Sequence, residues 1–129
     1  MPVTRVGGPY GDEARNGGAT VDPEEKAVTV LAYVSYFFGG MFLCNAIPHL
    51  VSGVTGRAFQ SPFAHPPGKG LSPALINVGW AAFNIVVAYV LVLRVGTFDL
   101  RDTVDAVVFG AGFIVMGLVA ARLFGPPRW

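Results

Sequence analysis

Formal charge is scarce in this sequence, and three long stretches have none at all. Asp, Glu, Lys and Arg make up 13% of the residues, against about 25% in a typical soluble domain. No charged residue occurs over residues 27–56, 70–93 or 106–121. A water-soluble domain of this size would expose such runs at its surface, so this class is disfavoured. The runs show no alternation of polar and apolar residues, which also argues against a membrane β-barrel.

Cysteine and histidine are also rare. The single cysteine, Cys44, excludes an intrachain disulfide. Cys44, His49 and His65 are the only soft metal ligands in the sequence, and no carboxylate lies near them in sequence. We therefore expect no cofactor, although haem or a metal shared between chains stays open. The net charge of +1 gives no indication of nucleic-acid binding.

The uncharged runs themselves predict membrane-spanning helices. A helix rises about 1.5 Å per residue, so about 20 apolar residues cross the hydrocarbon core. The first two runs reach this length, and the third reaches it when flanking residues such as Arg122, which can extend to the headgroups, are included. We predict an all-α integral membrane protein with three transmembrane helices, at about residues 23–52, 72–93 and 103–124. They form one domain, residues 23–125, between a flexible polar tail (1–22) and a short C-terminal tail (126–129).

Capping residues mark the expected helix starts. Asp22 followed by Pro23 is a typical start for the first helix. Ser72, which also precedes a proline, is the expected cap of the second helix. The third helix has two candidate caps, Asp99 and Thr103.

The connection over residues 53–73 is long for a loop between antiparallel helices. Its phenylalanines and prolines predict an ordered loop in the membrane interface. It contains no acidic residue. Its basic side chains are Arg57 and Lys69, and His65 is its one histidine. If this loop binds a ligand, a lipid phosphate or a carboxylate is the expected class, helped by the free amides that begin the next helix. The alternative is a rigid connector without a ligand.

Polar residues inside the spans fall on single faces. Asn45 and His49 are four residues apart on the first helix, and Asn77 and Asn84 are seven apart on the second. In an antiparallel hairpin, Asn45 and His49 lie at about the depth of Asn77. One interpretation is hydrogen bonding between helices. The other is a small polar site that opens toward the loop, with His49 as a proton acceptor or ligand contact.

The third helix carries small residues on one face, namely Ala106, Gly110, Gly117 and Ala121. Small residues at helical spacing let two backbones approach closely. The face can pack on the other two helices or on a second copy. Three spans enclose no solvated pathway by themselves, so transport would require an oligomer or a larger complex.

These observations predict first a small non-catalytic membrane protein, an accessory subunit or a homo-oligomeric scaffold. The alternative is an oligomeric transporter or binding protein for a small or anionic ligand, with a site formed by the polar faces and the basic loop. A membrane enzyme ranks third, because no nucleophile, base and orienting group lie at adjacent positions. The expected surroundings are the lipid bilayer, including anionic lipid. Small size and the lack of a processing signal favour a multi-pass protein of a bacterial inner membrane.

Overall fold

The structure, a computed structural model, describes residues 20–125. Its elements follow the chain as α1 (Pro23–Val54), β1 (Phe59–Gln60), β2 (Leu71–Ser72), α2 (Ala74–Leu93) and α3 (Thr103–Phe124). All three helices are long and apolar enough to cross a membrane. The prediction of an all-α membrane protein with three transmembrane helices is therefore confirmed. Of the predicted tails, residues 126–129 and most of 1–22 lie outside the described residues.

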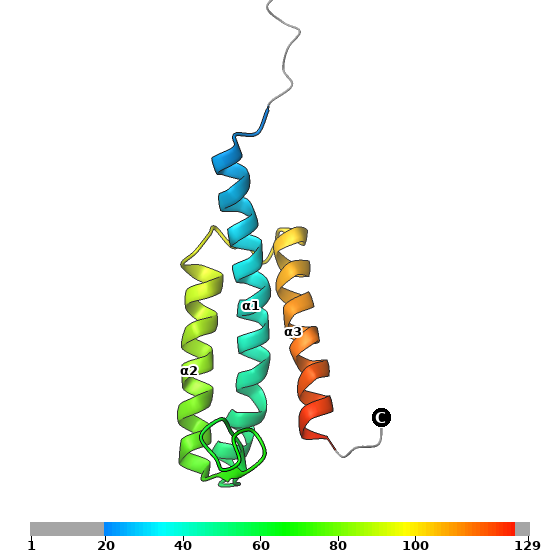
Figure 1. Cartoon of the computed structure of the whole chain (residues 1–129). Coiled ribbons are helices and arrows are strands. Elements are labelled where there is room, and N and C mark those ends of the chain that lie inside the picture. Colours follow the sequence, from blue (N-terminus) through cyan, green and yellow to red (C-terminus); the bar gives the residue numbers. More distant parts are fainter. Residues whose placement is uncertain (1–19, 126–129) are drawn as a thin grey trace, which may run out of the picture.

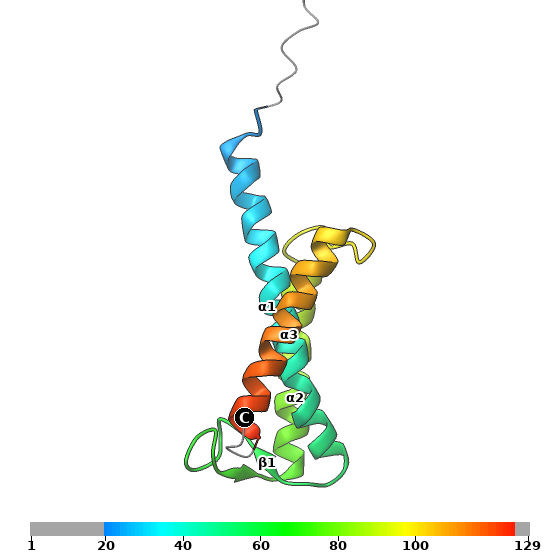
Figure 2. The same cartoon turned by 90° about the vertical axis from the view of Figure 1, so that its right-hand side faces the viewer.

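Helix α1 is the centre of the bundle. Helices α2 and α3 each pack against it, one on either side (Figure 1). The chain descends along α1, returns along α2 and descends again along α3 (Figure 1). With 32 residues against 20 in α2, α1 is longer by about 18 Å, and its first turns project beyond the other helices. The end that carries β1 and β2 is called the hairpin end below, and it also contains the last turn of α3 (Figure 2).

Two of the three helices are capped by aspartate side chains. Asp22 caps α1 as predicted, since its carboxylate accepts the backbone N–H of Glu24 at 3.3 Å. Helix α3 is capped by Asp102, so the expectation of Asp99 or Thr103 was wrong. The Asp102 carboxylate accepts two backbone N–H groups of the first turn, at 2.8 and 3.1 Å. Negative charge there also suits the positive end of the helix dipole.

The start of α2 departs from the expected pattern. Ser72 is not its cap: Pro73 occupies that position, and no side chain accepts a hydrogen bond there. Ser72 belongs instead to β2, which pairs antiparallel with β1, and its hydroxyl lies 2.5 Å from that of Ser61. The long connection is thus an ordered loop closed by a two-residue strand pair. Phe59 pairs with Ser72 and is half-buried, whereas Leu71 is exposed.

The interior of the bundle is polar and small, and its outside is apolar. The largest fully buried side chains are His49, Asn77, Asn84 and Ser61. On α3, by contrast, Val107, Ile114 and Leu118 are 62%, 61% and 68% exposed. This distribution is opposite to that of a soluble protein, and it suits a solvent of lipid tails.

Close contact between α1 and α3 depends on two glycines. A Cβ atom on Gly112 would overlap the backbone carbonyl of Phe37. One on Gly40 would overlap the carbonyl of Phe109. Both obstacles are backbone atoms, which cannot turn aside, so only glycine permits this helix separation at these two positions.

The small-residue face predicted from sequence is largely left open within the chain. A Cβ on Gly110 would meet nothing within 4 Å, and one on Gly117 would lie 3.6 Å from Cys44 Sγ. Ala106 is half-buried and Ala121 is exposed. Helix α3 contacts α1 through Gly112 and not through this face. Packing of this face against a second chain therefore stays a prediction.

Candidate functional site

Asn77 joins α2 to the hairpin connection. Its side-chain Nδ2 lies 3.0 Å from the carbonyl oxygen of Ser72, 3.2 Å from that of Pro73 and 3.3 Å from that of Phe59. Carbonyl oxygens only accept hydrogen bonds, so the amide group must present its NH₂ to them. Asn77 Oδ1 therefore points the other way, toward α1, as an acceptor.

This orientation fixes the tautomer of His49. Its Nδ1 lies 2.8 Å from Asn77 Oδ1, so Nδ1 carries the hydrogen and donates it. In the neutral ring the other nitrogen, Nε2, is then a bare acceptor. It has no hydrogen-bond partner among residues 20–125. The side chain is 2% exposed and is surrounded by the rings of Phe59, Trp80 and Phe124, with centroids 5.3, 6.4 and 6.2 Å away.

A second polar pair lies one turn further into the membrane. Asn84 donates through Nδ2 to the carbonyl of Trp80 at 2.8 Å, which leaves its Oδ1 as an acceptor. Asn45 Nδ2 donates to that oxygen at 3.0 Å. Asn45 Oδ1 is consequently a second acceptor for which the described chain provides no partner. The sequence predicted that Asn45 and His49 lie at about the depth of Asn77. The structure pairs His49 with Asn77 and Asn45 with Asn84 by hydrogen bonds across α1 and α2.

A cavity of about 510 Å³ opens beside these pairs at the hairpin end. Its walls come from all three helices and the connection, and include Asn45, His49, Gln60, Lys69, Trp80 and Phe124. Gln60 Oε1 is buried and is without a hydrogen-bond partner in the described part of the chain. An unpaired buried carbonyl costs about 1–3 kcal/mol. Two residues that line the cavity, His49 and Asn45, have an acceptor without a partner among the described residues. Gln60 lines it through atoms other than the fully buried Oε1.

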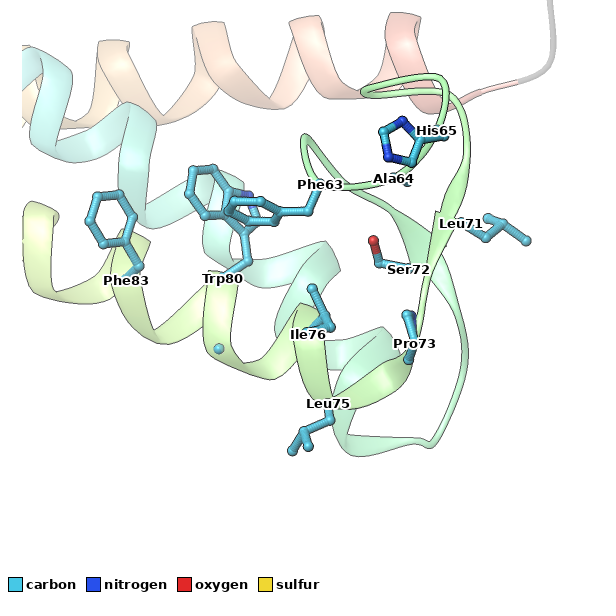
Figure 3. A pocket seen from close by; sticks show the side chains of 11 residues that line it. Phe63, Ala64, His65, Leu71, Ser72, Pro73, Leu75, Ile76, Trp80 and Phe83 are labelled. Carbon is cyan, nitrogen blue, oxygen red and sulfur yellow. The ribbon is translucent and has the colours of Figure 1, made fainter.

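A second, apolar hollow of about 800 Å³ lies on the outer side of α2 (Figure 3). Its lining includes Leu75, Ile76, Phe83 and the ring of Phe63, which contacts Trp80 edge to face at 5.3 Å. Trp80 also lines the polar cavity. A tryptophan with one apolar and one polar neighbourhood is typical of the membrane interface. We refer to this hollow as the outer groove.

The three basic or titratable loop residues predicted as one ligand site do not converge. Lys69 lines the polar cavity, His65 lines the outer groove, and Arg57 is exposed and lines neither. Sequence analysis also missed Gln60. Gln60 lines the same cavity as His49, and it belongs to a two-residue strand, which has no sequence signal strong enough to predict.

Charge separates between the two ends of the bundle. The chain has no acidic residue between Lys26 and Asp99, so in the described residues the hairpin end carries Arg57, Lys69 and Arg122 without a carboxylate. Asp99 and the first turn of α3 lie at the opposite end, together with the start of α1 (Figure 1). The hairpin end is therefore electrostatically suited to the phosphates of lipid headgroups.

Within residues 20–125 no group of three or more His, Cys, Asp or Glu side chains is placed to hold a metal ion. Cys44 is buried within the bundle, and His65 lies in a different hollow from His49.

The fold and the site define a class, a multi-pass helical membrane protein with a polar cavity at one end. No known family model, curated protein or solved structure matches the chain. Function is therefore argued below from the site alone.

Proposed function

We propose that this protein is a non-catalytic membrane protein that binds a small polar or amphiphilic ligand in the cavity at the hairpin end. The observation that carries the proposal is the cavity of about 510 Å³, lined by His49 and Asn45, each of which has an acceptor without a partner among the described residues. Hydrogen bonds between helices account for His49 Nδ1 and Asn77. They do not account for His49 Nε2 or Asn45 Oδ1.

The position of the cavity supports a ligand that enters from the membrane interface. His49 precedes the end of α1 by five residues, which corresponds to about 8 Å. The cavity therefore lies where the hydrocarbon core meets the headgroups.

Substitution of Gln60 by leucine tests this proposal. Removing a buried unpaired carbonyl leaves thermal stability in mild detergent unchanged or higher, whereas ligand retention falls. The measurement is mass spectrometry of small molecules and lipids released from purified wild type and variant. Arg57→Gln, in the same connection but outside both hollows, serves as the matched control and retains the wild-type ligand. Wild-type protein that releases no enriched molecule would contradict the proposal.

A second candidate function is assembly, either as a homo-oligomeric scaffold or as an accessory subunit of a larger complex. It is favoured by the open face around Gly110, where an added Cβ has free space. Transport remains possible only in such an assembly. The test is the mass of the detergent-solubilised particle: Gly110→Ile shifts an oligomer toward monomer, while a wild type that is already monomeric and lacks a partner removes this candidate. A bacterial inner membrane is the proposed location, to be tested by membrane fractionation.

A further inference from the structure

We infer that the protein has a second ligand site, at the end of the bundle opposite the hairpin end, and that this site binds a linear polyamine. The site is a hollow of about 620 Å³ between the first half of α1 and the connection from α2 to α3. We refer to it as the acidic hollow. It shares no lining residue with the cavity at the hairpin end, so the inference goes beyond the proposed function and does not depend on it.

Charge selects a cation for the acidic hollow. Asp99, Asp102 and Asp105 line it, and no lysine, arginine or histidine among residues 20–125 does so. Arg94 and Arg101 belong to the same connection, but they are exposed and lie outside the lining. The hydroxyl groups in the lining accept hydrogen bonds as well as donate them, so they do not oppose a cation.

Helix capping and turn contacts account for only one oxygen of each carboxylate. Asp102 Oδ1 accepts two backbone N–H groups of α3. Asp99 Oδ1 accepts the N–H of Arg101, and Asp105 Oδ2 accepts the N–H of Asp99. The second oxygen of each carboxylate has no hydrogen-bond partner among residues 20–125. Asp105 is only 8% exposed, and a buried carboxylate without a cationic partner is costly.

The position of Tyr36 is fixed by its neighbours, although its hydroxyl is unpaired. The side chain lines the acidic hollow and is 3% exposed. Its ring contacts those of Tyr33 and Phe98 edge to face, with centroids 6.1 and 5.0 Å away. The backbone of Gly96 lies against its hydroxyl, which an added Cβ would overlap. The hydroxyl is therefore held in place by packing, and no hydrogen bond within the described chain holds it.

The unpaired atoms of Tyr36 and Asp105 face open space. Within the described chain, Gln60 Oε1 is the one buried side-chain oxygen or nitrogen that lacks a partner and is also closed off from solvent. The Tyr36 hydroxyl and Asp105 Oδ1 are thus accessible despite the burial of their residues. The hollow that both residues line is the space that these atoms reach. This observation is independent of the number of acidic residues, and it indicates a ligand.

The spread of the carboxylates selects a ligand with several separated charges. Within residues 20–125 no group of three His, Cys, Asp or Glu side chains is placed to hold one metal ion, so the three carboxylates do not converge on a point. A linear polyamine carries ammonium groups joined by methylene chains. Val28, Ala32 and Val95 line the same hollow and provide apolar contact for the methylenes. The tyrosine rings of the lining also attract cations.

The acidic hollow lies where a water-soluble amine has access. Helix α2 has 20 residues and so extends for about 30 Å. The connection after it therefore lies at the membrane surface opposite the hairpin end (Figure 1). Asp99 and Asp102 are exposed there, whereas Asp105 and Tyr36 form the buried part of the lining.

The test compares amines that differ in their number of charges. Isothermal titration calorimetry of the full chain in a non-ionic detergent measures the affinity for spermidine, putrescine and butylamine, which have successively fewer amino groups. We expect each lost ammonium group to weaken binding about tenfold, because hydrogen bonds between charged groups are the strong ones. Mg²⁺ should bind more weakly than spermidine, since the carboxylates do not converge.

Variants assign the binding to this hollow. Asp105→Asn keeps an oxygen that accepts the N–H of Asp99 but removes the buried charge, and it weakens spermidine binding about tenfold. Tyr36→Phe keeps the ring contacts and removes the hydroxyl, which weakens binding about threefold. Glu25→Gln makes the same change of charge at the same end of the bundle but outside the lining, so it serves as the matched control and binds as wild type does. Melting temperatures without ligand report whether each variant is folded.

Several outcomes overturn the inference. Wild type that does not bind spermidine does so, as does wild type that binds butylamine as tightly. An affinity that survives in both Asp105→Asn and Tyr36→Phe, or that falls equally in Glu25→Gln, would reduce the effect to diffuse attraction by an acidic surface. Tighter binding of Mg²⁺ than of spermidine overturns the assigned class of ligand. None of these results bears on the cavity at the hairpin end, which Gln60→Leu tests separately.

Discussion

At the scale of single residues, Asn77 determines most of the chemistry at the hairpin end. Its amide contacts three backbone carbonyls on one side and His49 on the other. It therefore fixes the start of α2, the adjoining strand pair and the tautomer of the histidine together. In hydrocarbon a polar group without a partner costs several kcal/mol, so these contacts specify the fold and also the direction of the free Nε2.

Replacing Asn77 by alanine should destabilise the protein more than replacing Asn84. The first change removes the contact with His49 and those with three carbonyls, whereas the second removes only the bonds to Asn45 and the Trp80 carbonyl. Each lost bond within a membrane costs about 0.6–2 kcal/mol. The free energies of unfolding are measured by titration with a denaturing detergent. A larger loss in Asn84→Ala than in Asn77→Ala would contradict the assigned role.

These polar pairs were predictable from the sequence in part. The spacing of Asn45 and His49 on one helix and of Asn77 and Asn84 on the next gave the faces and the depth, because helical periodicity is regular. The presence of Gln60 in the lining of the same cavity was not predictable. Its position depends on the two-residue pairing of β1 with β2, which arises from the whole connection and from no local pattern.

At the scale of elements, the separation of α1 and α3 is set by Gly40 and Gly112. Sequence analysis instead predicted a small-residue face that includes Gly110. Composition indicates which residues are small, but the side of α3 that meets α1 depends on the connection after α2 and on the cap at Asp102. Run length predicted the three helices correctly, since the bilayer fixes the length that a span requires.

Alanine substitutions at the two α3 glycines should have opposite consequences for the fold. Gly112→Ala forces α3 away from the carbonyl of Phe37 and lowers the melting temperature in detergent. Gly110→Ala is neutral or slightly stabilising for the single chain, because its Cβ meets open space and alanine favours the helix by about 1 kcal/mol. Thermal unfolding of both variants measures this. A fold that tolerates Gly112→Ala while Gly110→Ala destabilises it would show that the α1–α3 contact has been assigned to the wrong face.

At the scale of the whole molecule, burial and charge are both arranged for a bilayer. The interior is filled by small and polar side chains, the outer faces of the helices are apolar, and the acidic residues within residues 20–125 lie away from the hairpin end. The bundle therefore has one end suited to lipid phosphates and an opposite end rich in carboxylates. The polar cavity lies at the first of these ends.

The measurement that tests this account most directly is the partition of the expressed chain between membranes and water. After lysis, an alkaline carbonate wash and high-speed centrifugation, we predict that the protein stays in the membrane pellet and enters solution only with detergent. Recovery of a compact, monodisperse species in the supernatant without detergent would contradict the account, because the exposed apolar faces of the helices would then have no lipid to contact.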